Sequence, residues 1–263
     1  MSSTQTTQVS ALLEGLAAGS VEVVDLTQPL SESTPVIKLP PPFANTPGLS
    51  REPISRYDDR GPAWAWYTLT IGEHVGTHLD APIHWVTGKD GADVASIPPS
   101  MLIGPACVVD KTAETEANPG YLLTSSDLEA WEAENGRLPE RAWVLMRTGW
   151  QSRAQDEAAF LNVSENGPKT PGPDVDASRW LAQERPISGF GTETVGIDAG
   201  AAGGFDPPFP LHNLLLGAGR LGLTQLANLD KLPITGALIV VSPLRLVGGT
   251  GSPSRAFALM PKG

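Results

Sequence analysis

The chain has a single cysteine, Cys107, so it cannot form an intrachain disulfide. Basic residues are also scarce, with 18 Lys and Arg against 29 Asp and Glu. The resulting net charge of −11 disfavours a nucleic-acid backbone or an anionic membrane as a partner. No apolar run of eighteen residues occurs, and no basic start precedes an apolar segment, so we expect neither a membrane span nor a signal peptide. These absences favour a reducing compartment, and we expect a cytoplasmic protein.

The abundant residues describe a loop-rich globular protein. Among 263 residues there are 28 Gly and 25 Pro, yet 40% are hydrophobic, which favours a folded α/β protein over a disordered chain. No linker, repeat or break in composition divides the sequence, so we expect one domain over residues 1–263. Residues 1–7 are rich in Ser, Thr and Gln, and we expect them to be disordered.

Local patterns predict the secondary structure. Helical spacing of apolar residues predicts a helix at 8–19, whose apolar stripe must be buried on its own subunit or at a subunit contact. A capping-box pattern at Ser126 and Glu129 starts another helix, which Gly136 can end. Residues 30–63 are proline-rich and aperiodic, and predict a long irregular excursion that is either a lid or a plain surface wrap. Further helices are predicted at 151–161, 174–183 and 211–216, and strands at 21–26, 105–111, 142–147, 187–190, 195–197, 236–246 and 255–259.

Residues 72–85 carry the most informative pattern, GEHVGTHLDAPIHW, which contains three of the four histidines. His74, His78, Asp80 and His84 are even-numbered, so an extended chain would project all four from one face. Two imidazoles and a carboxylate suit a divalent ion such as Zn²⁺ or Mn²⁺. A single histidine is more often a packed residue than a ligand, but four convergent polar groups would be costly if buried without an ion. We therefore predict that His74, His78 and Asp80 bind a metal.

His84 stands apart from these three ligands. On a straight strand it would lie roughly 13 Å beyond Asp80, which argues against direct ligation, although a bend at Pro82 would bring it closer. His84 then suits a proton shuttle across a bound substrate, and a merely packed histidine is the alternative.

Aromatic residues flank the pattern and offer flat apolar walls. Trp64 and Trp66 precede it, and Trp85 follows it. Such side chains can line a pocket for an aromatic substrate, with packing in the core as the alternative. The glycine run at 199–204 lacks the lysine and hydroxyl residue of a phosphate loop, and we interpret it as a turn that brings residues 206–212 to the site.

Residues 74–84 match the HxGTHxDxPxH signature of the metal-dependent cyclase family, which includes bacterial kynurenine formamidases and isatin hydrolases. The resemblance covers the chain from about residue 21 to the C-terminus. Within the family, the sequence is most similar to the isatin hydrolases. The family resemblance extends to four further segments: GID at 196–198, HNLLL at 212–216, LANLDKLP at 226–233 and GSPSR at 251–255. The resemblance to isatin hydrolases lies in three others: DRGPAWAW at 59–66, WVTGKD at 85–90 and GGFDPPFPLH at 203–212.

The resemblance implies a swivelling β/β/α fold with a mixed, barrel-like sheet and peripheral helices, assembled as a homodimer or homotetramer. It implies catalytic acid/base work for His84. His212 matches a residue that binds a second metal in two-metal formamidases, but Thr224 replaces the glutamate that completes that site. We therefore expect one Mn²⁺ or Zn²⁺ ion per subunit. His212 is then expected to act on substrate or water, with Phe209 and Gln225 binding substrate.

Together these features predict a metal-dependent hydrolase that opens a small cyclic amide, isatin to isatinate or a close analogue, by attack of a metal-activated water. An arylformamidase acting on N-formylkynurenine is one alternative. A non-catalytic, metal-containing small-molecule binding protein is the other, and His84 argues against it because binding alone needs no proton shuttle. The expected partner is an aromatic lactam or amide, with neither nucleic acid nor a membrane involved.

Overall fold

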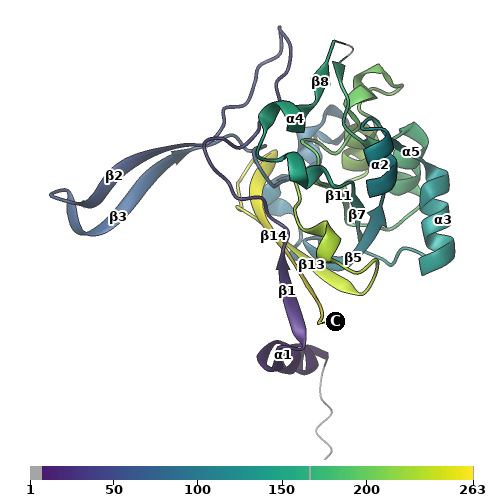
Figure 1. The fold of residues 1–263 in the computed structure, drawn as a ribbon, viewed down its shortest axis with the longest axis horizontal. Helices are drawn as coiled ribbons and strands as arrows, with labels where there is room; N and C mark the ends of the chain where they lie inside the picture. Colours follow the sequence, from purple (N-terminus) through teal and green to yellow (C-terminus); the bar gives the residue numbers. More distant parts are fainter. Residues whose placement is uncertain (1–7, 166, 263) are drawn as a thin grey trace, which may run out of the picture.

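A mixed sheet that closes on itself forms the body of the computed structural model, which describes residues 8–165 and 167–262 (Figure 1). Its strands are β1 (Val21–Asp25), β4 (His78–Asp80), β5 (Ile103–Asp110), β7 (Trp143–Arg147), β11 (Gly189–Thr192), β12 (Leu221–Thr224), β13 (Ala237–Pro243) and β14 (Gly251–Pro261). Their order is β1-β14-β13-β5-β7-β11-β12-β4, and β4 pairs again with β14, so that seven strands close into a barrel. The barrel-like mixed sheet is confirmed. The expectation for residues 1–7 lies outside the described residues.

Alternation along the buried strands divides the core into two layers. Val108 of β5 and Leu145 of β7 belong to a cluster that fills the barrel. Cys107 and Val144, one residue earlier on each strand, belong to a second cluster outside it. Successive side chains point to opposite faces of a strand, so strands buried on both faces must be apolar throughout. This explains the continuous apolar runs from which these two strands were predicted.

Helices cover the outer face of the parallel part of the sheet (Figure 1). β5, β7, β11 and β12 run parallel to one another. The longer helices α3 (Ser125–Asn135) and α5 (Val175–Gln183) belong to the outer cluster, through Trp131 and Trp180. The smaller elements are α2 (Thr112–Ala117), α4 (Glu157–Leu161), β6 (Leu122–Leu123), β8 (Val163–Ser164), β9 (Gly167–Pro168) and β10 (Gly172–Pro173).

Three local predictions are wrong in detail. The capping box of α3 is formed by Thr124 and Asp127, two residues earlier than predicted. The Thr124 hydroxyl accepts from the Asp127 backbone N–H, and the Asp127 carboxylate accepts from the Thr124 backbone N–H. The helix predicted at 151–161 is a 3-10 turn, η5 (Trp150–Arg153), followed by α4. The segment 195–197 was predicted as a strand but is irregular: the preceding strand, β11, ends at Thr192, and the chain does not re-enter the sheet before residue 198.

Two elements project from the barrel (Figure 1). One is the N-terminal helix α1 (Gln8–Ala18), close to its predicted bounds, with no buried residue. The other is a hairpin of β2 (Ser50–Asp58) and β3 (Gly61–Thr70). The irregular excursion predicted at 30–63 is therefore wrong from Ser50 onward. Both faces of the hairpin are largely exposed, so the alternation that normally reveals a strand is missing. Among the described residues, no helix is long and apolar enough to cross a membrane.

Candidate metal centre

The residues of the signature come together through two changes of direction. Only His78–Asp80 is a strand, β4, which pairs with β12 on one side and β14 on the other. A turn at Gly76, with a φ of 65° that favours glycine, precedes β4 and returns His74 to it. The 3-10 turn η1 (Pro82–His84) then brings His84 against His74, with ring centroids 4.0 Å apart. An extended chain over the whole signature is thus wrong at both ends, whereas the bend at Pro82 that would bring His84 closer is confirmed.

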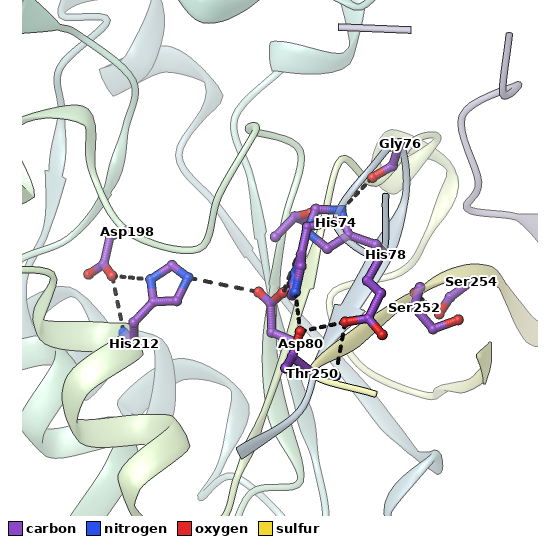
Figure 2. A network of polar contacts seen from close by, with 11 residues as sticks. His74, Gly76, His78, Asp80, Asp198, His212, Thr250, Ser252 and Ser254 are labelled. Atoms are coloured by element: carbon purple, nitrogen blue, oxygen red, sulfur yellow. Dashed lines mark hydrogen bonds and ion pairs between the residues drawn. The ribbon is translucent and has the colours of Figure 1, made fainter. Parts of the chain in front are cut away.

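His74, His78 and Asp80 form the centre of the site (Figure 2). Each can offer one ligand atom, and these atoms lie within 4.8 Å of one another. Asp80 Oδ1 is 2.8 Å from His74 Nδ1 and 3.5 Å from His78 Nε2. Burial by itself would raise the pKa of Asp80, but the charge of His78 and the hydrogen bond with His74 hold it well below its usual range. Two imidazoles and an ionised carboxylate at these separations fit a divalent ion with open coordination positions.

Hydrogen bonds around the triad determine which nitrogen of each histidine faces it. His78 Nδ1 donates to Gly76 O at 2.7 Å, which turns Nε2 toward Asp80. His74 Nε2 lies 2.9 Å from Thr250 Oγ1, and that hydroxyl donates to Glu73 Oε2 at 2.5 Å. His74 therefore turns Nδ1 toward the carboxylate of the triad. Outer hydrogen bonds of this kind orient metal ligands and set their tautomers.

Two glycines leave room for the triad. Gly222 on β12 and Gly251 on β14 are the residues opposite Asp80 in the two ladders. A Cβ at position 222 would lie 2.9 Å from Asp80 Oδ2, and one at position 251 would lie 2.4 Å from His74 Cε1. Both distances are shorter than close-packed atoms tolerate. The flanking strands thus provide space that a larger residue would fill.

His84 borders the triad as a neutral imidazole. Burial lowers its pKa to about 4, a shift that the charge of Asp80 opposes and that His74 and His212 reinforce. Its ring centroid is 5.6 Å from that of His212. At neutral pH the His84 ring can therefore accept a proton.

His212 is held differently, at the start of the π-helix η7 (His212–Leu216). Its Nδ1 lies 2.6 Å from Asp198 Oδ2, and the same carboxylate accepts the backbone N–H groups of Leu211 and His212. Burial would lower the pKa of His212, but the hydrogen bond and charge of Asp198 raise it. Its Nε2 faces the triad, 3.9 Å from Asp80 Oδ2 (Figure 2). His212 thus presents Nε2 to the triad.

An aromatic wall and an apolar cavity adjoin His212. The ring centroid of Trp85 lies 4.8 Å from that of His212 and 5.6 Å from that of Phe209. A cavity of about 630 Å³ is lined in part by His212 and Phe209. The cavity walls are mainly apolar and include Ile37, Leu39, Leu161, Val163 and Val195. Part of the 30–63 excursion therefore borders the cavity.

Three other residues that were expected to bind substrate, Trp64, Trp66 and Gln225, do not line this cavity. Trp64 and Trp66 are on the projecting hairpin, 48% and 54% exposed, and their ring contact at 6.3 Å is with each other. Gln225 is buried after the end of β12, where its backbone oxygen accepts from Thr77 Oγ1 at 2.6 Å. None of these three is among the described residues that line the cavity.

Sequence reasoning missed the partners that orient the histidines. Glu73 and Thr250 are 177 positions apart, so no local pattern could pair them. Asp198 belongs to the GID segment at 196–198, which signalled its importance without revealing His212 as its partner.

Comparisons with known proteins agree with this geometry. The Cyclase family model matches residues 24–199. An isatin hydrolase from Roseibium aggregatum is 50% identical over 257 residues, which cover 97% of this chain and 97% of that protein. A crystal structure of an isatin hydrolase bound to the product analogue thioisatinate matches with a TM-score of 0.95 and 49% identity, over 99% of this chain and 100% of that one. A kynurenine formamidase from Salinibacter ruber is 29% identical over 191 residues, which cover 72% of this chain and 77% of that protein.

We expect Gly251→Ala to weaken metal binding. The added methyl would displace the His74 ring, and disturbing the contacts that orient a ligand typically costs about 10–100-fold in metal affinity. Competition with a chelating dye, using Zn²⁺ and Mn²⁺ in turn, measures the dissociation constant. Gly120→Ala is the matched control, since its nearest atom would be 3.7 Å away. Equal affinities for the two variants would argue against a ligand role for His74.

Proposed function

Because this chain belongs to the Cyclase family, we propose that it is a metal-dependent hydrolase that opens the ring amide of isatin to give isatinate. The observation that carries the proposal is His84, a neutral imidazole stacked at 4.0 Å on a residue of the His74, His78 and Asp80 triad. The isatin hydrolase that is 50% identical over nearly the whole chain supports this substrate. Hydrolysis of N-formylkynurenine is the second candidate, supported by the more distant kynurenine formamidase.

His74, His78 and Asp80 would hold the divalent ion, Mn²⁺ or Zn²⁺. Such an ion lowers the pKa of water toward neutrality and polarises a carbonyl group as a Lewis acid. The fit rests on the donor set, with His74 Nδ1 and His78 Nε2 turned toward an ionised carboxylate.

Hydrolysis of the ring amide adds water to the carbonyl carbon and breaks the C–N bond. One proton must leave the water, and the ring nitrogen must gain one. His84 is neutral at neutral pH, so it can accept the first proton and return it to the nitrogen. His212, protonated at Nδ1 by its bond to Asp198, can hydrogen-bond the substrate or water through Nε2. The product is an aminophenyl glyoxylate anion with a freed amine, and the second proton of the water is released when the new carboxyl group ionises.

The aromatic residues beside His212 select a flat substrate. Trp85 and Phe209 lie edge to face with ring centroids 5.6 Å apart, and Phe209 also lines the cavity. Planar bicyclic molecules gain both burial and ring contacts against such a wall. An extended, charged amino-acid side chain, as in N-formylkynurenine, gains less from it.

The substrate test compares isatin with N-formylkynurenine. Loaded with Mn²⁺ or Zn²⁺, the protein should hydrolyse isatin with a kcat/KM at least about tenfold above that for N-formylkynurenine, since about 1.4 kcal/mol of extra aromatic contact gives this ratio. Absorbance changes follow ring opening and loss of the formyl group. A reversed ratio would assign the chain to the formamidases.

Substitutions at the site should separate metal binding from proton transfer. We expect His84→Ala to retain the ion and lose about 10²–10⁴ in kcat, as is typical when an acid/base group is removed. Asp80→Ala should lose both the ion and turnover. Metal content and isatin turnover are measured on the same samples. Unchanged turnover by fully loaded His84→Ala would exclude the shuttle.

One ion per subunit is expected at saturation. A second dication would need its own anionic ligand, but Thr224 supplies only a neutral hydroxyl, 3.0 Å from His78 Nδ1. Asp198 is already engaged by His212. Elemental analysis of protein purified without chelator should therefore give about one equivalent. A value near two, with activity rising over the second equivalent, contradicts this expectation.

A further inference from the structure

The cavity beside His212 is larger than the proposed substrate needs. Its volume of about 630 Å³ lies within the range of roughly 300–1,000 Å³ that is usual for pockets of drug-sized ligands. Isatin is a compact molecule of two fused rings. Its reacting carbonyl must lie at the triad, and His74, His78 and Asp80 do not line this cavity. Most of the volume is therefore left for a group that isatin itself does not carry.

Two residues, His212 and Phe209, join the cavity to the proposed catalytic groups. His212 turns Nε2 toward the triad and Nδ1 toward Asp198, and both His212 and Asp198 line the cavity (Figure 2). Phe209 lines the cavity as well, and its ring contacts that of Trp85. A flat substrate that lies against Trp85 would therefore direct its far edge toward the cavity.

The described walls of the cavity offer no spare charge. Besides His212, the ionisable residues that line it are Asp198 and Lys38. Asp198 is engaged by His212, and Lys38 forms an ion pair with Glu157. The other described lining residues are apolar side chains, glycines and prolines, apart from Thr170. A charged group that entered would lose its hydration without gaining a partner, so the walls favour an uncharged, apolar group.

We propose that this cavity is a subsite for an apolar group attached to the benzo ring of the substrate, so that the chain hydrolyses aryl- or alkyl-substituted isatins in preference to isatin. The inference rests on the proposed function, because it extends the substrate of that reaction into the cavity. Ring opening itself is unchanged. Water adds to the carbonyl carbon, the C–N bond breaks, and the apolar group stays on the aromatic ring of the product.

The position of the subsite determines which kinetic constant should respond. Leu39 contributes from the irregular segment between β1 and β2, Leu161 from the end of α4, and Val195 from the segment after β11. Burial of an apolar group against such walls is favourable in proportion to the area removed from water. Because the group does not touch the reacting atoms, it binds equally well before and in the transition state. We therefore expect it to lower KM and to leave kcat unchanged.

The first experiment compares isatin with isatins that carry one phenyl group on the benzo ring, with each positional isomer tested in turn. The best isomer should have a kcat/KM about ten- to hundredfold above that of isatin, as expected for burial of a group the size of a Phe side chain. The difference should lie in KM. The proposal is overturned if no isomer is hydrolysed more efficiently than isatin.

A variant that fills the cavity tests where the phenyl group binds. Gly196 lines the cavity, and a Cβ there would have no atom within 4 Å, so Gly196→Leu places a side chain in open space. The ratio of kcat/KM for the best phenyl isomer to that for isatin should fall to about one or below. Gly204→Leu is the matched control, since position 204 is equally open but does not line the cavity, and it should keep the wild-type ratio. If Gly196→Leu fails to fold, Val163→Trp replaces it, because Val163 lines the cavity and is 65% exposed. An unchanged ratio in the filled variant overturns the proposal.

Binding measured without turnover separates this inference from the proposed function. Calorimetry on Zn²⁺-loaded His84→Ala protein gives the dissociation constants of isatin and of each phenyl isomer. At least one isomer should bind about ten- to hundredfold more tightly than isatin, and Gly196→Leu in the same background should remove the difference. Equal affinities overturn the subsite, whichever amide the wild type hydrolyses. Absence of isatin turnover by the wild type, with the difference in affinity intact, overturns only the proposed function.

Discussion

Burying an ionised carboxylate is costly unless its charge is compensated, and in this protein Asp80 is compensated by two histidines from its own chain segment. The strand that carries Asp80 also joins β12 to β14 and so closes the barrel. Gly222 and Gly251 leave space on either side for the carboxylate and for the His74 ring. The charge cluster and the sheet are thus built around the same three-residue strand.

Two further histidines of the site, His84 and His212, have pKa values shifted in opposite directions although their ring centroids are only 5.6 Å apart. Burial keeps His84 neutral, whereas the Asp198 carboxylate raises the pKa of His212. The two rings therefore differ in how readily they hold a proton, although both border the triad. They differ because burial dominates at His84, whereas the hydrogen bond and charge of Asp198 outweigh burial at His212. The difference in function arises from neighbours that are distant in sequence.

The signature made the cluster of His74, His78 and Asp80 predictable, because these residues lie within seven positions and offer the kinds of ligand atom that one ion takes. Buried strands were also predictable, since both of their faces are apolar. The path of the chain between His74 and His84 was not predictable. A turn at Gly76 and a 3-10 turn at Pro82, rather than one strand, bring His74 and His84 together. Short motifs encode which residues meet more reliably than the path by which they meet.

Long-range contacts and exposed elements escaped prediction for different physical reasons. The bond between Glu73 and Thr250 spans 177 positions, and only the closed barrel brings these residues together. The hairpin over residues 50–70 lacks alternation because both of its faces are exposed in one subunit. Periodicity reports burial within a chain, so an element that is not buried by its own chain leaves no such signal.

The small size of β4 has a thermodynamic consequence. Three residues of β4 close the barrel. Two of them, His78 and Asp80, belong to the triad, and Asp80 lies opposite Gly222 and Gly251. Any ion that binds the folded triad and not the unfolded chain adds RT ln(1 + [L]/Kd) to the free energy of unfolding. The closure of the sheet is therefore linked to the free concentration of the ion. Removing the metal would therefore lower the stability of the barrel where β4 closes it, as well as stop the reaction.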